Sequence, residues 1–186
     1  MSTPIFTFKI VIGGAGGVGK TTLLIRYLKN IFQADTTMTI GVGFYNKDVV
    51  RPEATSKLAI WDLGGQDRFR VVQSQYVAGA KAALVFFDMS RLDSMAQVEE
   101  WVTLFRKSAI PSIPIILCGT KEDVCQPGEL ELATDAAATT VGMLGLVQFF
   151  PTSSKTGSNV VAVFDRIVDI LLAGVGIQSS SPDPAL

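Results

Sequence analysis

The sequence of 186 residues contains no histidine. Without an imidazole the chain cannot build a Ser-His-Asp triad, a Cys-His pair or a histidine-based general acid or base. Cysteine is scarce as well: Cys118 and Cys125 lie seven residues apart, which fits neither a CxxC redox motif nor the usual zinc spacing. We expect both to be free thiols in a reducing cytosol. Any catalysis must rest on carboxylates, amides, hydroxyls, lysines or a metal ion.

Long apolar runs are also missing. No segment reaches the roughly 20 apolar residues that a membrane-spanning helix needs, and the stretch Val160–Ile177 is interrupted by Asp165, Arg166 and Asp169. The N-terminus lacks the order of charge, apolar run and cleavage site that marks a signal peptide. Residue 2 is Ser2, and the final residues contain no cysteine, so we expect neither myristoylation nor prenylation. We therefore predict a cytoplasmic protein whose contact with membranes is indirect.

The overall composition is balanced, with 48% hydrophobic residues, 18% charged residues and a formal net charge of -1. Such a chain is typical of a globular protein and does not favour nucleic acid as a partner. Its length suits one domain with a single substantial core. We predict a domain over residues 1–177 and a disordered tail over residues 178–186, which are rich in serine and proline.

Apolar periodicity predicts alternating strands and helices. Strands are expected at Phe6–Ile12, Phe44–Val50, Lys57–Asp62, Ala82–Phe87, Ile113–Leu117 and Val147–Phe150. Helices are expected at Lys20–Lys29, from a cap at Asp93 or Ser94 through Phe105, at Thr134–Leu144 and at Asn159–Leu172. The turn-rich segment 51–56 favours a hairpin. The pattern predicts an α/β class, a doubly wound and mostly parallel six-stranded sheet flanked by about five helices.

A glycine-rich segment joins the first strand to the first helix and matches the pattern G-x-x-x-x-G-K-[ST]. It consists of Gly14, Ala15, Gly16, Gly17, Val18, Gly19, Lys20 and Thr21, with Thr22 following in the helix. Its backbone N–H groups can turn inward around phosphate oxygens, while the lysine supplies a charge and Thr21 can ligate Mg²⁺. The alternative is a glycine turn with an incidental lysine. The pattern predicts phosphate binding but neither the base nor the reaction, because ATPases and kinases share it.

Four further motifs occur downstream in the order and approximate spacing of small GTPases. They are Thr39-Ile40-Gly41-Val42, Asp62-Leu63-Gly64-Gly65-Gln66, Thr120-Lys121-Glu122-Asp123 and Thr152-Ser153-Ser154-Lys155. With the phosphate loop they make the chain resemble the Ras-like superfamily from about Phe6 to Leu172. The resemblance implies a P-loop GTPase fold. The second motif looks Arf-like, the first Rab-like and the third Rho-like, so the chain resembles a divergent member of mixed character.

The resemblance also implies roles around the phosphates. Thr21 and Thr39 would ligate Mg²⁺, and Asp62 would hold the metal through water. Gly65 would offer its N–H to the γ-phosphate. Gln66 would orient the attacking water, so that Gln66, Lys20 and Thr39 form the catalytic set. A merely solvated Gln66, a capping Asp62 and an ordinary loop threonine at position 39 are the alternatives.

For the base, the resemblance implies guanine. Asp123 would accept two hydrogen bonds from guanine, and the N–H of Ser154 would bond its O6 atom, where adenine presents a donor instead. Lys121 and Lys155 would cover the two base faces, and Phe32 its edge. The alternative for Phe32 is packing in the core. The predicted base-binding residues also include Thr120, which replaces the commonest asparagine, and Ser153.

The function implied is a switch that binds GTP or GDP with Mg²⁺ and hydrolyses GTP slowly. No confident arginine finger is present, since Arg68 and Arg70 suit exposed loop positions, so a GAP-like partner would supply one. Effectors, GAP-like regulators and exchange factors would bind the segments near Thr36–Gly43 and Gly64–Tyr76, and the strand Phe44–Val50 offers a pairing edge. Two alternatives are a nucleotide-holding interaction module that scarcely hydrolyses GTP, and a P-loop ATPase or kinase.

Overall fold

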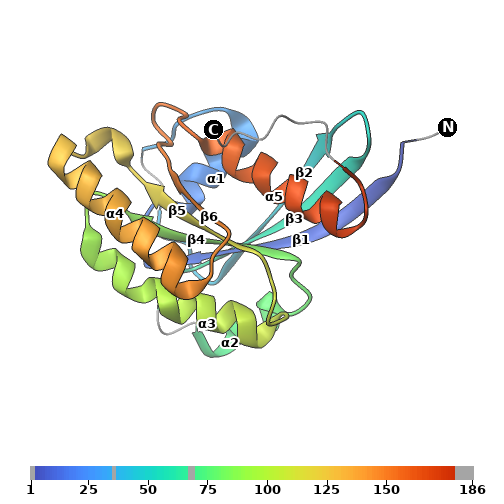
Figure 1. Ribbon diagram of the computed structural model, residues 1–186, viewed down its shortest axis with the longest axis horizontal. Coiled ribbons are helices and arrows are strands. Elements are labelled where there is room, and N and C mark those ends of the chain that lie inside the picture. Colours follow the sequence, from blue (N-terminus) through green and yellow to red (C-terminus); the bar gives the residue numbers. More distant parts are fainter. Residues whose placement is uncertain (1–2, 35–36, 67–69, 179–186) are drawn as a thin grey trace.

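The computed structural model describes residues 3–34, 37–66 and 70–178. A twisted sheet runs through the middle of the molecule with helices on both faces (Figure 1). Its strands are β1 (Ile5–Gly14), β2 (Val42–Val50), β3 (Thr55–Leu63), β4 (Ala82–Asp88), β5 (Ile115–Thr120) and β6 (Gln148–Pro151). The strands lie in the order β2-β3-β1-β4-β5-β6, and β2 is antiparallel to β3 while the other pairs are parallel. The predicted α/β class and mostly parallel six-stranded sheet are confirmed.

Five helices flank the sheet, within the described residues. They are α1 (Lys20–Lys29), α2 (Arg70–Val77), α3 (Val98–Ser108), α4 (Pro127–Leu144) and α5 (Val160–Gly174), with short 3-10 turns η2 (Leu92–Gln97) and η3 (Glu122–Val124). No helix in this part of the chain has the length and apolar character needed to cross a membrane. The predicted tail, residues 178–186, lies outside the described residues except for Gln178.

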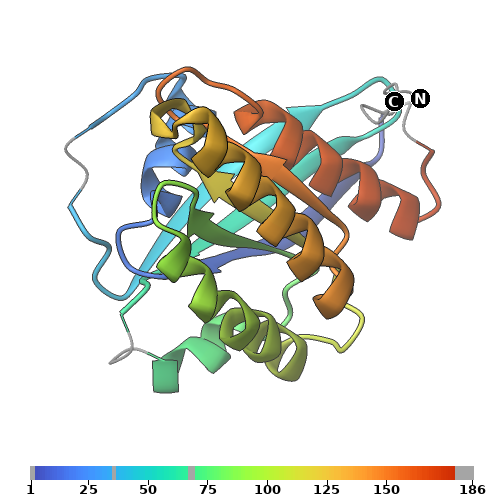
Figure 2. The same cartoon turned by 60° about the vertical axis from the view of Figure 1, so that its left-hand side comes forward.

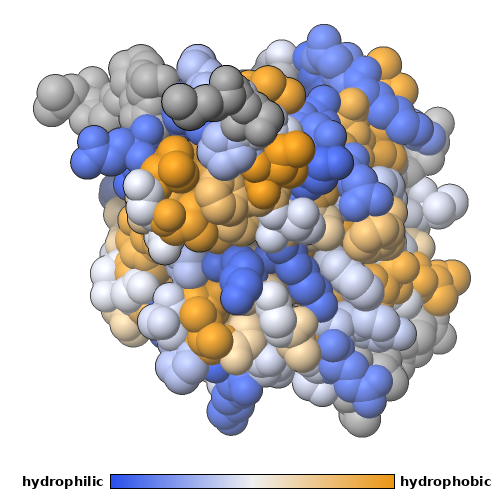
Figure 3. Space-filling view, turned by 90° about the vertical axis from the view of Figure 1, so that its right-hand side faces the viewer, coloured by the Kyte–Doolittle hydropathy of each residue, from blue (hydrophilic) through white to orange (hydrophobic). Residues whose placement is uncertain are grey.

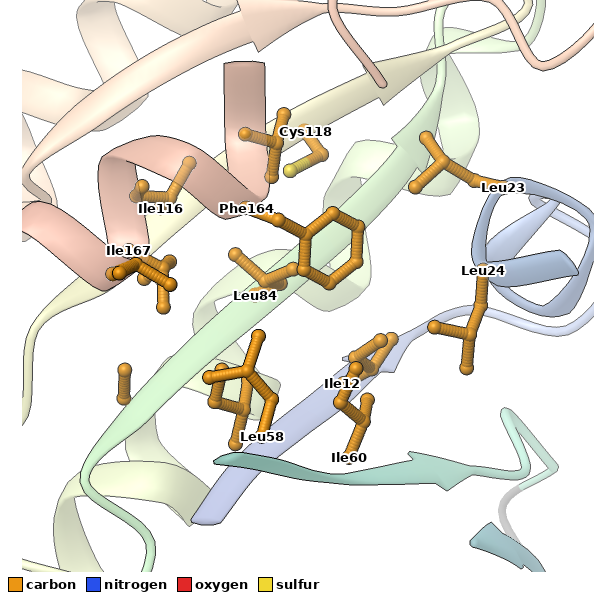
Figure 4. Packing of buried hydrophobic residues seen from close by; sticks show 14 of the residues in the cluster. Ile12, Leu23, Leu24, Leu58, Ile60, Leu84, Ile116, Cys118, Phe164 and Ile167 are labelled. Atoms are coloured by element: carbon orange, nitrogen blue, oxygen red, sulfur yellow. The ribbon is translucent and has the colours of Figure 1, made fainter. Parts of the chain in front are cut away.

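The core has two layers, one on each face of the sheet. On one face α1 and α5 pack their apolar sides onto alternate residues of the central strands, with the Phe164 ring at the centre of this layer (Figure 4). On the other face Trp101 and Phe105 of α3 are buried together with alanines of α4 and the end of α2. Strand β4 is buried at every residue because it is covered from both sides. The apolar runs therefore fix where the helices must lie.

The layers leave one end of the sheet for the loops that follow the parallel strands. Turning the molecule brings this end forward, with the β1–α1 loop beside the loops after β4, β5 and β6 (Figure 2). Helices α1 and α3 lie on opposite faces, so the connections after β1 and β4 diverge there, which is where open α/β sheets form their binding crevice. At the opposite end, where β1 starts, apolar and polar residues are interspersed on the surface (Figure 3).

Several predicted boundaries were wrong. Helix α4 begins at Pro127, not Thr134, because the Glu129 carboxylate accepts a hydrogen bond from the Gln126 N–H at 2.9 Å and caps an earlier first turn. Strand β5 runs to Thr120 rather than Leu117, since it stays paired with β4 through Asp88.

The predicted cap of α3 was also wrong. Ser94 lies within η2 and its hydroxyl donates to the Arg91 carbonyl at 2.6 Å, while α3 begins only at Val98. Asp93 likewise belongs to η2. Helix α2 had no counterpart among the predicted segments, because its eight residues carry only a weak apolar stripe.

Candidate nucleotide-binding site

The phosphate loop is shaped by close packing at its start. Strand β1 ends at Gly14, where φ is +140° and a Cβ atom would lie 2.4 Å from the Phe86 carbonyl oxygen of β4. No larger residue fits this approach. The loop then passes through Gly17 and Gly19, both with positive φ, and the chain enters α1 at Lys20. The loop amides therefore precede a helix N-terminus, an arrangement that favours anions.

The Lys20 side chain lies inside this loop and is 6% exposed. Its ammonium group donates to the Gly14 and Ala15 carbonyl oxygens, both at 2.8 Å. Burial lowers the pKa of Lys20 to about 8, opposed by the charge of Asp62. A charge held by carbonyl groups in a buried position is favourable for binding an anion directly over the loop.

Three oxygen-bearing side chains converge next to the lysine. The Thr21 hydroxyl donates to Asp62 Oδ2 at 2.5 Å, and the hydroxyls of Thr21 and Thr39 lie 2.7 Å apart. Asp62 is fully buried, yet its Oδ1 atom has no hydrogen-bond partner within the described residues. Burial raises the pKa of Asp62, while the Thr21 hydrogen bond and the Lys20 charge oppose this shift. Two hydroxyls and a carboxylate with an unpaired oxygen fit a hard divalent cation such as Mg²⁺.

No group of three or more His, Cys, Asp or Glu residues able to hold a metal occurs in the part of the chain that the structure describes. Among the described residues, a cation between Thr21, Thr39 and Asp62 would thus have a single carboxylate ligand, which leaves positions for oxygen ligands from outside the protein. Water and phosphate oxygens are the ligands that Mg²⁺ commonly takes in such sites. The donor set thus fits a metal that binds together with a phosphate ligand.

A cavity of about 240 Å³ opens over the loop, and a second of about 310 Å³ adjoins it. Gly19, Thr22, Ala34 and Lys121 line both. The first is otherwise lined by Gly16, Gly17, Lys20, Thr21, Thr37, Met38, Thr39 and Gly65, and the second by Phe32, Thr120, Asp123, Val124, Ser154 and Lys155. Together they form one elongated site with the phosphate loop at one end and Asp123 at the other.

The loops after β5 and β6 build the second end of the site. The Ser153 hydroxyl is buried and donates to Asp123 Oδ1 at 2.6 Å, which orients that carboxylate. The Thr120 hydroxyl donates to the Val18 carbonyl oxygen at 2.5 Å and so ties β5 to the phosphate loop. Lys121 adopts a left-handed backbone conformation with φ +62°, and its ammonium reaches towards the Gly17 carbonyl at 3.5 Å. Such strained residues persist where the surroundings hold them firmly.

The structure brings most of the predicted residues together. Five of them do not line the cavity but support lining residues through the hydrogen bonds described above: Asp62, Gly14, Ala15, Val18 and Ser153. Predicted positions Thr36 and Arg68 lie outside the described residues, as does the side chain of Arg70.

Gln66 is the exception among the predicted catalytic residues. It follows Gly65 directly and is half-buried, but it does not line either part of the cavity. Phe32 does line the second part and is 43% exposed, which excludes the alternative that it packs in the core.

Sequence reasoning missed some residues of the site. Ala34, Thr37 and Met38 line the cavity although no motif includes them. Asp88 is fully buried and lies 2.7 Å from the Lys121 ammonium. The signal that could have identified Asp88 is a carboxylate at the end of the apolar run Ala82–Phe87.

The fold and the site together define a class: a P-loop protein of doubly wound α/β architecture, with the glycine-rich loop at the end of β1 and a mixed hydroxyl and carboxylate site beside it.

Comparison with known proteins narrows the class. The sequence matches the Ras family model over residues 9–173. The chain is 36% identical over 173 residues to Ras-related protein Rab-25 of Bos taurus, covering 93% of this chain and 80% of that protein. It is 34% identical over 179 residues to Ras-related protein Rab-3 of Caenorhabditis elegans, covering 96% of this chain and 80% of that protein. It is 33% identical over 181 residues to Ras-related protein Rab-3C of Mus musculus, covering 97% of this chain and 78% of that protein.

The chain therefore belongs to the Ras family and is a small GTPase of the switch type. The resemblance predicted from the motifs is confirmed at this level.

Proposed function

We propose that this chain binds GTP and GDP together with Mg²⁺, hydrolyses GTP slowly, and changes its switch segments with the nucleotide state. The single observation that carries this is the convergence of the buried Lys20 ammonium with Thr21, Thr39 and the unpaired oxygen of Asp62 at one end of the cavity. Lys20 and the loop amides would bind the β- and γ-phosphates. Thr21, Thr39 and Asp62 would hold the metal, which neutralises charge that develops on the phosphates.

In the proposed reaction a water oxygen forms a bond to the γ-phosphorus, and the bond from that phosphorus to the oxygen bridging to the β-phosphate breaks. The protons of the water end on the released phosphate. The Gly65 N–H would bind a γ-phosphate oxygen, and Gln66 would turn into the cavity to orient the water. Thr39 and Gly65 would thus lose a partner when the γ-phosphate leaves, and this loss would release the segments that contain them.

Guanine selectivity is proposed at the other end of the site. Asp123 is oriented by Ser153 and would accept two hydrogen bonds from guanine, while the Ser154 N–H would bond its O6 atom. Adenine presents a donor to Ser154 and would leave buried polar groups unpaired. Lys121 and Lys155 would cover the base faces, with Phe32 at its edge.

Turnover without a partner is proposed to be slow. No arginine lines either part of the cavity among the described residues. An arginine supplied by a partner typically raises kcat by about 10³ to 10⁵. We therefore expect a GAP-like protein to accelerate the reaction.

A surface for protein partners is proposed beside the switch segments. The Phe44 ring lies 5.2 Å from that of Trp61, which lies 5.7 Å from that of Tyr76. Phe44 and Tyr76 are exposed, as is the neighbouring Ile40. Aromatic groups exposed between two segments that respond to nucleotide suit recognition by effectors.

One observation favours a second candidate function, an interaction module that holds the nucleotide but scarcely hydrolyses it. Gln66 does not line the cavity, so water could lack its orienting amide. In that case the nucleotide would serve mainly to order the partner surface.

The test begins with displacement of fluorescent GDP from the full chain by GTP, GDP or ATP, with Mg²⁺ or with a chelator. We expect GTP and GDP to compete and ATP not to compete. Single-turnover phosphate release is then compared between the native chain and Gln66→Leu. A decrease of about tenfold or more is expected for the variant. Equal rates would favour the interaction module, and competition by ATP would contradict guanine selectivity.

A further inference from the structure

A carboxylate outside all the sequence motifs lies directly behind the proposed base site. Asp88 is the last residue of β4, is paired in register with Thr120 of β5 and is fully buried. Its Oδ1 atom accepts from the Ser90 N–H at 3.0 Å and the Ser90 hydroxyl at 2.6 Å. Its Oδ2 atom accepts from Lys121 Nζ at 2.7 Å and Arg91 Nε at 3.2 Å. Both oxygens of this carboxylate are therefore used.

The contact of Asp88 with Lys121 links distant parts of the chain, whereas its contacts with Ser90 and Arg91 are local. Ser90 and Arg91 belong to the turn that follows β4, whereas Lys121 is 33 residues away in sequence and lines both parts of the cavity. Its backbone is held at φ +62° by the loop after β5, and its ammonium is held by Asp88 on one side and approaches the Gly17 carbonyl on the other. With both ends of the side chain fixed, the methylene groups between them must lie along the cavity wall.

Burial of the carboxylate argues against a role limited to closing the turn. A carboxylate removed from water is costly unless cations and hydrogen bonds compensate it, and apolar residues usually serve stability at least as well. The turn already holds a polar alternative, because the Ser94 hydroxyl accepts from the Asp88 N–H at 2.9 Å and donates to the Arg91 carbonyl at 2.6 Å. Despite burial, the contacts with Lys121, Ser90 and Arg91 hold the pKa of Asp88 below its usual value, so the group is charged at neutral pH.

We propose that Asp88 is a positioning residue for bound nucleotide: it fixes the Lys121 ammonium beside the phosphate loop, so that the lysine methylenes cover the base and the nucleotide leaves slowly. This inference rests on the proposed function, because it assigns Lys121 to one face of the base. Asp88 does not line the cavity, so it would act on the nucleotide only through Lys121.

The experiment measures dissociation of fluorescent GDP from the full chain in Mg²⁺, chased with unlabelled GDP. The variants are Asp88→Asn, Lys121→Met, the double variant and Arg91→Met. Asp88→Asn keeps the shape of the side chain but removes its charge. We expect it to speed GDP release by about tenfold or more, in line with a lost hydrogen bond between charged groups.

The Lys121→Met background separates positioning from a structural role. If Asp88 acts through Lys121, adding Asp88→Asn to Lys121→Met should change the release rate by less than about twofold, because the two changes remove the same interaction. A structural role would give the same increase in both backgrounds. Arg91→Met is the matched control: it removes the other cation from the same oxygen and should leave the release rate within about twofold of native, because Arg91 does not line the cavity.

The inference is overturned if Asp88→Asn releases GDP at the native rate, if its effect persists in the Lys121→Met background, or if Arg91→Met is as fast as Asp88→Asn. Should Asp88→Asn fail to fold, as judged by circular dichroism, Asp88→Ser takes its place in the same cycle with the same expected outcomes. Failure of the proposed function is distinct, because the native chain itself would then not bind labelled GDP.

Discussion

At the residue scale, the segment after β3 meets the phosphate loop so closely that side chains are excluded. A Cβ atom on Gly65 would lie 2.5 Å from the Ala15 carbonyl carbon and the Gly16 nitrogen. A Cβ atom on Gly64 would lie 2.7 Å from the Thr39 carbonyl oxygen, and the Gly64 N–H donates to the Gly41 carbonyl at 2.8 Å. The Gln73 amide donates to the Gly64 carbonyl at 2.7 Å from the other side. These two glycines connect both proposed switch segments with the loop.

Gly65→Ala should therefore weaken the binding of GTP more than that of GDP, because Gly65 is proposed to contact the γ-phosphate. The added methyl group would push this segment from the loop, and overpacking against backbone costs about 1–3 kcal/mol, or about 5-fold to 150-fold in affinity. Titration with fluorescent GTP and GDP analogues measures both affinities. The matched control is Gly128→Ala, where nothing lies within 4 Å of the added atom, and its affinities should equal those of the native chain. Equal losses for GTP and GDP would contradict the placement of Gly65 at the γ-phosphate.

The two thiols should differ sharply in reactivity. Cys118 is fully buried and burial raises its pKa well above the ordinary value of 9.0, whereas Cys125 is partly exposed, with a pKa raised by partial burial and by nearby carboxylates such as Glu129. A thiol reagent at pH 8 should label one cysteine quickly in the native chain and two after unfolding, and Cys125→Ser should abolish the fast reaction. Rapid labelling of two thiols in the native chain would contradict the buried position of Cys118.

The same shift predicts a pH dependence of stability. The folded state keeps the Cys118 proton, whereas the unfolded state loses it above about pH 9. The contribution of this thiol to the free energy of unfolding is therefore fully present below that pH and declines as the pH rises. Unfolding by urea at pH 8 and pH 10 should show a smaller alkaline decrease for Cys118→Ala than for the native chain. An equal loss of stability in the variant and the native chain would show that this thiol does not cause the alkaline decrease.

The sequence alone locates residues whose position is tied to a fixed spacing. The phosphate loop is one continuous segment, so its pattern alone identified Lys20 as the charged residue of the loop, whereas the hydrogen bonds of its ammonium to the Gly14 and Ala15 carbonyl groups were seen only in the structure. Asp88 was missed because its partner Lys121 is distant in sequence and is brought close only by the pairing of β4 with β5. The side chain of Gln66 shows the reverse: the motif identified it, but the motif does not fix which way it points.

At the scale of elements, the β2–β3 hairpin is attached to α5 by one side chain. Arg51 follows β2, its side chain is 9% exposed, and its guanidinium pairs with Asp165 at 3.3 Å and also with Asp169. It donates to the Asp165 carbonyl as well, at 3.2 Å. Charge and hydrogen bonds thus join the edge of the sheet to the last helix, on the face opposite α3.

Arg51→Met should destabilise the protein, because it leaves the Asp169 carboxylate largely buried beside an apolar side chain. We expect a loss of about 1–2 kcal/mol in the free energy of unfolding, less than for a fully buried pair since Asp165 is half-exposed. Urea unfolding with GDP present measures it. Lys57→Met, which breaks the exposed Lys57–Asp48 pair of the same hairpin, should change stability by less than about 0.5 kcal/mol. Similar losses in both variants would refute a special role of Arg51.

Elements were predicted best where burial on one face imposed a clear period. Strand β4 and helix α5 are continuous in their apolar pattern, and both lie close to their predicted positions. The first two turns of α4 were missed because Pro127 and Gly128 suggest a turn, although proline is well tolerated in the first turn of a helix. Helix α2 is short, and its position depends on the packing of Val77 in the same core layer as α3 and on the Gln73 hydrogen bond to Gly64, which no local pattern reveals.

At the scale of the whole molecule, the proposed ligand contacts loops that follow β1, β3, β5 and β6. Its binding should therefore stabilise the entire fold, because the unfolded chain cannot present these loops together. GDP with Mg²⁺ at about 100 times its Kd should add about 2.7 kcal/mol and raise Tm by about 5–10 °C. A thermal scan with ATP and Mg²⁺ is the control and should show no rise. Equal shifts with ATP and GDP would contradict guanine selectivity at Asp123.

The sequence by itself determined the α/β class, the phosphate loop and the family, since each depends on local spacing or on apolar periodicity that burial imposes. Only the tertiary structure decided which other distant side chains meet: Asp88 with Lys121, Ser153 with Asp123, and Arg51 with α5. These contacts depend on strand register and on the path of the loops. Both are set by the packing of the whole chain, and no short segment encodes them.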